Sequence, residues 1–112
     1  MATVYKVLGR KAAAATTEEE LYTVPSATEA VVSTLVVCNR SGSARSYRIA
    51  VKPTAATTLA DEHFIAYDVS IPANDTVALT LGITLAANNA IRVYASASSS
   101  LTFTAFGSEI TA

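Results

Sequence analysis

The sequence predicts an all-β domain, an antiparallel β-sandwich of jelly-roll or immunoglobulin-like type with about eight short strands. Successive side chains of a strand point to opposite faces, so apolar residues at every second position indicate a strand with one buried face. Residues that favour turns separate such stretches about every 8–12 residues. With 112 residues, the chain is expected to form one domain, residues 1–112. The alternating stretches are Tyr47–Val51, Ile65–Ile71, Val77–Leu85, Ile91–Ala95 and Leu101–Ala105.

The amino-terminal part contains two predicted strands joined by a loop. Thr3–Gly9 predicts a first short strand, and Leu21–Val24 a second one that ends before a proline. Lys11–Thr17 contains consecutive alanines that favour a helix, but the run is too short for a stable helix, so we expect a loop with at most one helical turn. Residues 1–20 are a candidate assembly segment within the domain, and we expect a partner to order the loop 12–20.

The stretch Glu29–Asn39 differs from the others because it is apolar on both predicted faces. A strand of this kind is central in its sheet, or is covered on its second face by another element or chain. The small polar residues Asn39–Ser43 then predict a turn. In the following strand, Tyr47–Val51, the apolar residues alternate with Arg48 and Lys52, which are expected to face solvent.

Ile65–Ile71 and Val77–Leu85 are expected to fold back on each other as a hairpin. The connecting residues Pro72–Asp75 favour a turn, because proline fixes φ, asparagine tolerates a left-handed backbone and aspartate can bond the backbone beyond it. A second turn is predicted at Asn88–Asn89, and a bulge at Gly107 would explain a change of phase there. The predicted core comprises Val32 or Leu35, Tyr47, Ile49, Val51, Ile65, Val69, Leu79, Leu81, Ile83, Val93 and Phe103.

Charged residues are scarce, at 15% of the chain compared with about 25% in an average soluble domain. We expect part of this surface to be covered by a partner or by copies of the chain. The net charge of −1 and the lack of a clustered basic face argue against nucleic-acid binding. No signal peptide or apolar stretch near the ~18 residues of a membrane helix is apparent, so we expect no membrane contact and a reducing cytoplasm. Cys38 is the single cysteine, which excludes an intrachain disulfide, and is expected to be buried.

No group of residues points to catalysis, a cofactor or a metal, so the chain is expected not to be an enzyme. His63 is the single histidine, whereas metal sites and nucleophilic triads need a histidine with partners or clustered cysteines. The segment Asp61–His63 resembles a fragment of a metal site, but adjacent strand residues point to opposite faces. We interpret it as a loop that enters a strand.

Two charged groups remain as candidates for an interface. The acidic run Glu18–Glu20 is interpreted as a solvated loop, with a cation-attracting patch as the alternative. Arg40, Arg45 and Arg48 are close in sequence and fit a sheet edge that stays soluble. Their alternative role is to bind an acidic partner or a carbohydrate.

The strands and turns between Val31 and Glu109 form a pattern that resembles small structural proteins of tailed-bacteriophage virions. The resemblance implies a β-sandwich that decorates the capsid as a cement protein, or that belongs to a head fibre, tail or tail fibre. Such proteins bind other virion proteins and usually have no enzyme activity. The segments that carry the resemblance are Ser33–Gly42, Tyr47–Val51, Ile71–Thr76, Leu79–Leu85, Ile91–Ser96 and Leu101–Glu109.

We therefore expect a capsid decoration protein that binds and stabilises the capsid surface, made in the bacterial host cytoplasm and located in the virion. Its expected partners are copies of itself, with a trimer as the first expectation, and virion proteins such as the major capsid protein. The alternatives are a tail, baseplate or fibre-associated component, or a free carbohydrate- or ligand-binding module that uses Tyr67 and Tyr94. The residues expected in an interface are Tyr5, Lys11, Glu18, Glu19, Glu20, Arg40, Arg45 and Arg48.

Overall fold

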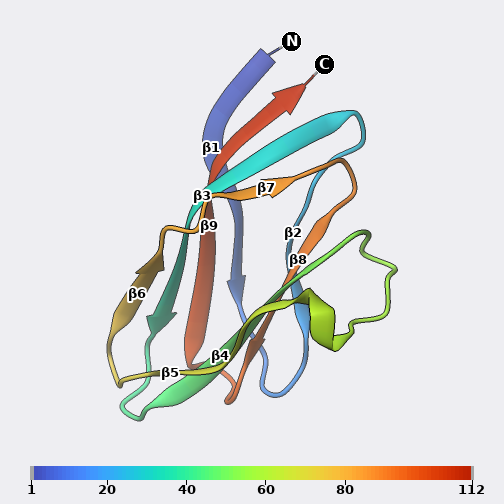
Figure 1. Cartoon of the computed structure of the whole chain (residues 1–112). Coiled ribbons are helices and arrows are strands. Elements are labelled where there is room, and N and C mark those ends of the chain that lie inside the picture. Colours follow the sequence, from blue (N-terminus) through green and yellow to red (C-terminus); the bar gives the residue numbers. More distant parts are fainter. Residues whose placement is uncertain (1, 112) are drawn as a thin grey trace.

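The computed structural model describes residues 2–111 and contains two antiparallel sheets that face each other (Figure 1). Sheet I has the order β1 (Ala2–Ala12), β9 (Leu101–Thr111), β3 (Thr28–Asn39) and β6 (Thr76–Leu79), and β7 (Ile83–Leu85) also pairs with β3. Sheet II has the order β2 (Glu19–Thr23), β8 (Ala90–Ala95), β4 (Arg45–Lys52) and β5 (Phe64–Ile71). The 3-10 helix η1 (Asp61–His63) precedes β5.

The strand order is that of a jelly roll. Because β6 pairs with Leu35–Cys38 and β7 with Ala30–Val32, the two strands share one edge position beside β3. Strands β1 to β4 alternate between the two sheets, and the first and last strands are paired neighbours in sheet I. This arrangement matches two interwound Greek keys and differs from the immunoglobulin order. Of the two expected sandwich types, the chain therefore forms the jelly roll.

The core lies between the sheets and is built around two aromatic side chains. Tyr47 of sheet II and Phe103 of sheet I are 2% and 0% exposed, and their rings meet edge-to-face with 6.3 Å between centroids. Of the predicted core residues, Val51, Leu79 and Ile83 are partly buried against this cluster. The predicted core residues that are fully buried are Val32, Leu35, Tyr47, Ile49, Val93 and Phe103.

The predicted central strand Glu29–Asn39 is confirmed as β3, which lies between β9 and the edge pair β6 and β7. Its inner face, with Val32, Leu35 and Val37, is buried against sheet II. Its outer face carries the half-buried side chains of Val31 and Val36. The two apolar faces of this strand thus have different surroundings, one in the core and one on the surface of sheet I.

The predicted hairpin between Ile65–Ile71 and Val77–Leu85 is wrong, because the two segments belong to different sheets. β5 pairs with β4 in sheet II, whereas β6 and β7 pair with β3 in sheet I. The predicted turn between them is present: Asn74 has φ 57°, and Asp75 Oδ1 accepts a hydrogen bond from the N–H of Thr76 at 2.8 Å. This turn crosses the gap between the sheets and does not join paired strands.

Three predicted core residues, Ile65, Val69 and Leu81, are 48%, 38% and 50% exposed. In β5 the pairing shifts between Tyr47↔Val69 and Ile49↔Ala66, so the alternation changes phase at a bulge. Leu81 lies between β6 and β7, where Gly82 adopts φ 63° and breaks the predicted continuous strand.

The irregularity expected at Gly107 is present, but the extra residues lie in the neighbouring strands. On β3, the pairs Val32↔Gly107 and Thr34↔Phe106 leave one unpaired residue between them. On β1, the register also shifts, between Val7 and Gly9, opposite the same part of β9. β9 is therefore flanked by bulges on both sides at this point.

The amino-terminal segment is part of the fold. β1 pairs with β9 from Ala2↔Thr111 to Ala12↔Thr102, so the two ends of the chain lie side by side (Figure 1). Leu8 of β1 is buried in the core cluster. Removing β1 would therefore remove an edge strand of sheet I, and an assembly role for this segment must be tested with single substitutions.

Candidate functional site

The residues expected in an interface lie on both outer faces of the sandwich. Tyr5 is 84% exposed on β1, and Arg40 donates a hydrogen bond from Nε to Thr102 Oγ1 at 2.8 Å. Arg48 lies on sheet II, and the buried Nε of Arg45 has no hydrogen-bond partner within residues 2–111. The three arginines that are close in sequence therefore have different surroundings and do not form one patch.

The acidic run Glu18–Glu20 takes part in ion pairs, so the interpretation as a solvated loop is wrong. Glu18 Oε1 lies 2.9 Å from Arg92 Nε and 3.5 Å from Lys52 Nζ. Arg92 also reaches Glu20 at 4.0 Å. Lys52, which the sequence placed in solvent, is 4% exposed because Nζ turns into this cluster and donates to the Ala55 carbonyl at 3.2 Å.

The loop before β2 is held by its own domain, so the expectation that a partner orders it is wrong. The backbone N–H of Thr16 donates to the carbonyl of Ala95 at 2.9 Å. Glu19 accepts a hydrogen bond from the N–H of Ala14 at 2.6 Å and pairs with Lys11 at 3.5 Å. The hydrogen bond from Ala14, with Lys11 nearby, keeps the pKa of Glu19 below its usual value.

Sheet II has a pocket of about 210 Å³ on its outer face. Its floor includes Ala50 of β4, which pairs with Arg92 of β8 on one side and Phe64 of β5 on the other. Paired residues of neighbouring strands have their side chains on the same face, so two large side chains flank a methyl group and leave a hollow. The next pair along the strands, Arg48 and Tyr94, closes one end. Two nearby loops contribute Thr16, Glu18 and Leu59.

The side chain of Arg48 is held in a fixed position beside this pocket. Its Cζ atom lies 4.2 Å from the ring centroid of Tyr67 and 4.3 Å from that of Tyr94. Nε and Nη2 donate to the two carboxylate oxygens of Asp68 at 2.6 and 3.3 Å, and this contact keeps the pKa of Asp68 below its usual value. Cation–π contacts and a two-point charged hydrogen bond both restrict the guanidinium.

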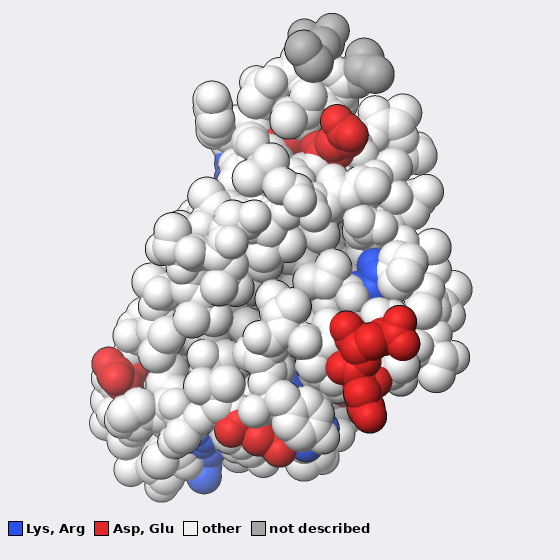
Figure 2. All heavy atoms as spheres, in the orientation of Figure 1, with Lys and Arg blue, Asp and Glu red and all other residues white. Residues whose placement is uncertain are grey.

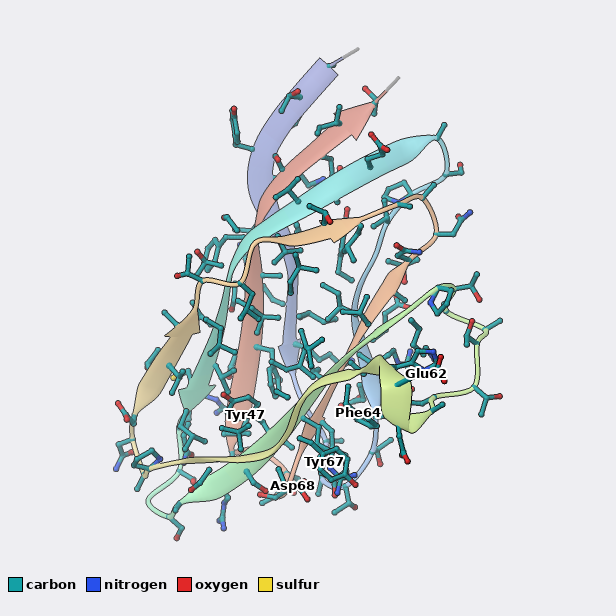
Figure 3. All side chains as sticks on the ribbon, viewed as in Figure 1. Tyr47, Glu62, Phe64, Tyr67 and Asp68 are labelled. Carbon is teal, nitrogen blue, oxygen red and sulfur yellow. The ribbon has the colours of Figure 1, made fainter. Side chains whose placement is uncertain are left out.

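Two aromatic side chains of β5 lie at one side of the pocket. The rings of Phe64 and Tyr67 meet edge-to-face with 4.9 Å between centroids. In Figure 3, Phe64 lies beside η1, and Tyr67 and Asp68 follow further along β5. A second, more open hollow of about 510 Å³ is lined by Asp61, Phe64 and Tyr67, so Phe64 borders both hollows.

The outer face of sheet I has a different chemistry. Its side chains are mostly aliphatic, aromatic or hydroxyl-bearing, and a shallow groove of about 650 Å³ runs beside Tyr5, Val31 and Phe106. Phe106 is 39% exposed at this position. Two charged residues, Arg10 and Glu29, belong to the outward rows. Two more are close to this face, because Arg40 donates to Thr102 of the outward rows and Lys6 lines the groove. The uncharged residues in these rows are Thr3, Tyr5, Val7, Ala12, Val31, Thr34, Val36, Cys38, Thr102, Thr104, Phe106, Ser108 and Ile110.

Charge is also uneven over the face seen in Figure 2. Uncharged side chains cover most of this view, and acidic side chains gather over η1, where Asp61 and Glu62 lie. The rest of this view is mostly uncharged.

Tyr22, Glu109 and Lys6 form a polar contact that joins the two sheets. The Tyr22 hydroxyl on β2 donates to Glu109 Oε2 on β9, and Lys6 Nζ lies 3.1 Å from Glu109 Oε1. Burial raises the pKa of Tyr22, and the hydrogen bond to the carboxylate raises it further. The same hydrogen bond keeps the pKa of Glu109 below its usual 4.5. In the folded chain the contact therefore favours a neutral tyrosine and an ionised glutamate.

The stability of the fold is expected to decrease as the pH falls from about 6 to about 3. A carboxyl group whose pKa is lowered by folding contributes stability that is complete above its unfolded pKa and is lost as the pH falls through its folded pKa. Glu109 belongs to this class. In urea denaturation followed by circular dichroism, Glu109→Gln should show a flatter dependence on pH than the wild type. Glu62→Gln, at an exposed position on η1, is the control, and equal slopes for Glu109→Gln and the wild type would contradict the prediction.

Sequence reasoning missed the residues that shape the pocket on sheet II. Arg92, Phe64 and Ala50 received no role in the sequence analysis. The available signal was that Arg48, Arg92 and Tyr94 occupy outward positions of their strands. The missing information was that β4 lies between β8 and β5.

Other candidate chemistry is limited. Cys38, expected to be buried, is half-buried on the outer face of sheet I. His63 Nδ1 accepts a hydrogen bond from the N–H of Ala60 at 2.9 Å. Within residues 2–111, no three His, Cys, Asp or Glu side chains gather as metal ligands would. No helix in that range has the length and apolar character needed to cross a membrane.

Comparison with known proteins identifies no family for this chain. No protein-family model matches the sequence, and no curated protein is significantly similar to it. The resemblance to phage virion proteins therefore depends on the strand and turn segments quoted above.

Proposed function

We propose that this chain is a non-enzymatic structural protein of a tailed-bacteriophage virion, specifically a capsid decoration protein that binds and stabilises the capsid surface. The sequence resemblance is the reason for proposing a phage virion as the assembly. The observation that carries an assembly role is the outer face of sheet I, where Tyr5 and Phe106 are exposed, most other side chains are half-buried apolar or hydroxyl groups, and few are charged. Large exposed apolar areas on soluble proteins mark sites of association. A jelly roll is also a fold that virion proteins use.

In this proposal, the outer face of sheet I contacts a second copy of the chain. Arg10 on β1 and Glu29 on β3 lie in different outward rows of that face, on opposite sides of β9. A head-to-tail copy can bring the arginine of one chain near the glutamate of the next. Contacts of this type form a closed ring when the rotation between copies fits, and a trimer is the small ring that we expect. The rest of the surface is then available to the capsid.

Phe106→Glu is expected to weaken self-association about a hundredfold or more, because it buries an unpaired charge in the interface. Ile65→Glu is the matched control, since Ile65 is similarly exposed, at 48% compared with 39% for Phe106, but lies on sheet II. Sedimentation velocity of the two variants and the wild type measures the effect. Circular dichroism shows whether each variant is folded.

The virion part of the proposal is tested with purified particles of the phage whose genome encodes this chain. We expect mass spectrometry to find the wild-type chain and Ile65→Glu in the particles, and to find Phe106→Glu strongly depleted. A chain that self-associates but is absent from particles would overturn the virion assignment and leave the interface intact. A wild-type chain that stays monomeric and is absent from particles would overturn both.

A further inference from the structure

We propose that the pocket on the outer face of sheet II binds one ring of a neutral sugar. The pocket is small, about 210 Å³, compared with roughly 300–1,000 Å³ for sites that hold drug-sized ligands. Its floor includes the methyl group of Ala50, and its walls combine aromatic rings with charged and hydroxyl side chains. A sugar ring has the matching properties, since it is small, has apolar C–H faces and carries hydroxyl groups around its edge.

The charges around the pocket favour a neutral ligand. Three basic side chains, Arg48, Lys52 and Arg92, face three acidic ones, and each basic group already has an acidic partner. An anion would have to compete with Asp68 and Glu18 for the arginines. A cation would likewise have to compete with the arginines for the carboxylates. A neutral ligand needs no such exchange and avoids the cost of burying an unpaired charge.

The polar groups in the wall include both a hydrogen-bond donor and an acceptor for the hydroxyl groups of a sugar. A guanidinium has five N–H donors, and the contacts of Arg48 with Asp68 use those on Nε and Nη2. Glu18 Oε1 faces Arg92 and Lys52, and Oε2 makes no hydrogen bond within residues 2–111. A sugar hydroxyl can therefore accept from Arg48 and donate to Glu18. Arg48 is held between two rings and Glu18 by two cations, so little side-chain ordering remains to be done on binding.

The aromatic walls suit the C–H faces of a sugar ring. Phe64 and Tyr94 line the pocket on opposite sides of β4. Phe64 also lines the second hollow, with Asp61 and Tyr67. The adjoining hollow gives room for a further sugar unit beyond the first ring. The ligand can thus be a free monosaccharide or a unit within a polysaccharide, and binding of short oligomers distinguishes these sources.

This inference does not depend on the proposed function. The pocket lies on sheet II, whereas the proposed contact between copies uses the outer face of sheet I. Both surfaces can be occupied in one molecule, and the isolated chain is sufficient for the test.

The test is a titration of the isotope-labelled chain, followed by nuclear magnetic resonance. The probes are neutral monosaccharides (glucose, galactose, mannose and N-acetylglucosamine), their short oligomers, glucuronate, sialic acid and inorganic phosphate. We expect at least one neutral sugar to shift the amide resonances of Ala50, Phe64 and Tyr94. Tighter binding of an oligomer, with further shifts at Asp61 and Tyr67, would identify a polysaccharide as the source. Equal affinities would identify the single sugar.

Tyr94→Ala is expected to weaken sugar binding about tenfold, and Glu18→Gln should also weaken it. Tyr5→Ala is the matched control, because it removes an exposed tyrosine from the opposite sheet. Circular dichroism checks that each variant is folded. The proposal is overturned if no neutral sugar shifts these resonances, if only glucuronate, sialic acid or phosphate does, or if both pocket variants bind as tightly as the wild type.

Discussion

Gly107→Ala is expected to lower the free energy of unfolding by about 3 kcal/mol or more. A Cβ atom at this position would lie 1.9 Å from the carbonyl oxygen of Val31 and 2.9 Å from its carbonyl carbon. Both are backbone atoms of β3, the strand paired with β9 at this point. Because the clashing atoms belong to the backbone and not to a flexible side chain, two strands in the middle of sheet I would have to separate to relieve the clash.

Gly42→Ala provides the matched control. Gly42 lies in the turn after β3, and a Cβ atom there would have no heavy atom within 4 Å. Its expected effect is within about 0.5 kcal/mol of zero. Urea denaturation of the three proteins, followed by circular dichroism, gives the comparison. Gly107→Ala with wild-type stability would mean that β3 and β9 are further apart at this position than described here.

The close approach at Gly107 lies beside a bulge in β3. Each of the two bulges puts an extra residue into a strand that neighbours β9, and the backbone of β3 lies against the α-carbon of Gly107. The sequence identified the position through the change of phase at Phe106. It did not identify the strand that contains the extra residue, because alternation within β9 says nothing about β1 or β3.

Local alternation predicted the strands correctly where each has one core face and one outer face. The segments around Tyr47–Val51, Ile91–Ala95 and Leu101–Ala105 are strands β4, β8 and β9. Because the core holds their inward side chains, the apolar residues at every second position in the sequence all lie on the inner face of the strand. The turn Pro72–Asp75 was also predictable, since its residues favour a turn by their own backbone preferences.

Strand pairing was less predictable. A short turn between two alternating strands favours a hairpin, yet β5 and β6 pair with different sheets. Asn39 helps to determine this arrangement, because its buried amide donates to the carbonyls of Ile71 and Pro72 at 3.3 and 3.0 Å. That contact joins residues far apart in the sequence, so the local alternation of apolar and polar residues cannot predict it.

The same limit applies to the two outer faces. Arg48 was expected to face solvent and lies on the outer face of sheet II, but the pocket beside it exists because β8, β4 and β5 lie in that order. Ala50 becomes part of its floor only because Arg92 and Phe64 are its cross-strand partners. The apolar outer face of β3 was visible in the sequence as a strand with two apolar faces. That this apolar face continues across β9 and β1 could not be predicted, because it depends on the order of the strands in sheet I.

Leu35→Ala is expected to lower the free energy of unfolding by about 2–5 kcal/mol. Leu35 is 0% exposed, on the inner face of β3, and its truncation leaves a cavity in the core. Leu81→Ala makes the same chemical change at a residue that the alternation also placed in the core, but Leu81 is 50% exposed.

The expected cost of Leu81→Ala is below about 1 kcal/mol, because half of the side chain is already in water and the loop around Gly82 can adjust. Urea denaturation of both variants at neutral pH measures the difference. A large cost at Leu35 with a small one at Leu81 follows if the run Val77–Leu85 is broken between β6 and β7. Similar large costs at both positions would mean that Leu81 is buried and that the run forms one continuous strand. The two variants thus distinguish the observed arrangement, in which β6 and β7 are separate strands, from the single continuous strand that the period-two pattern predicts.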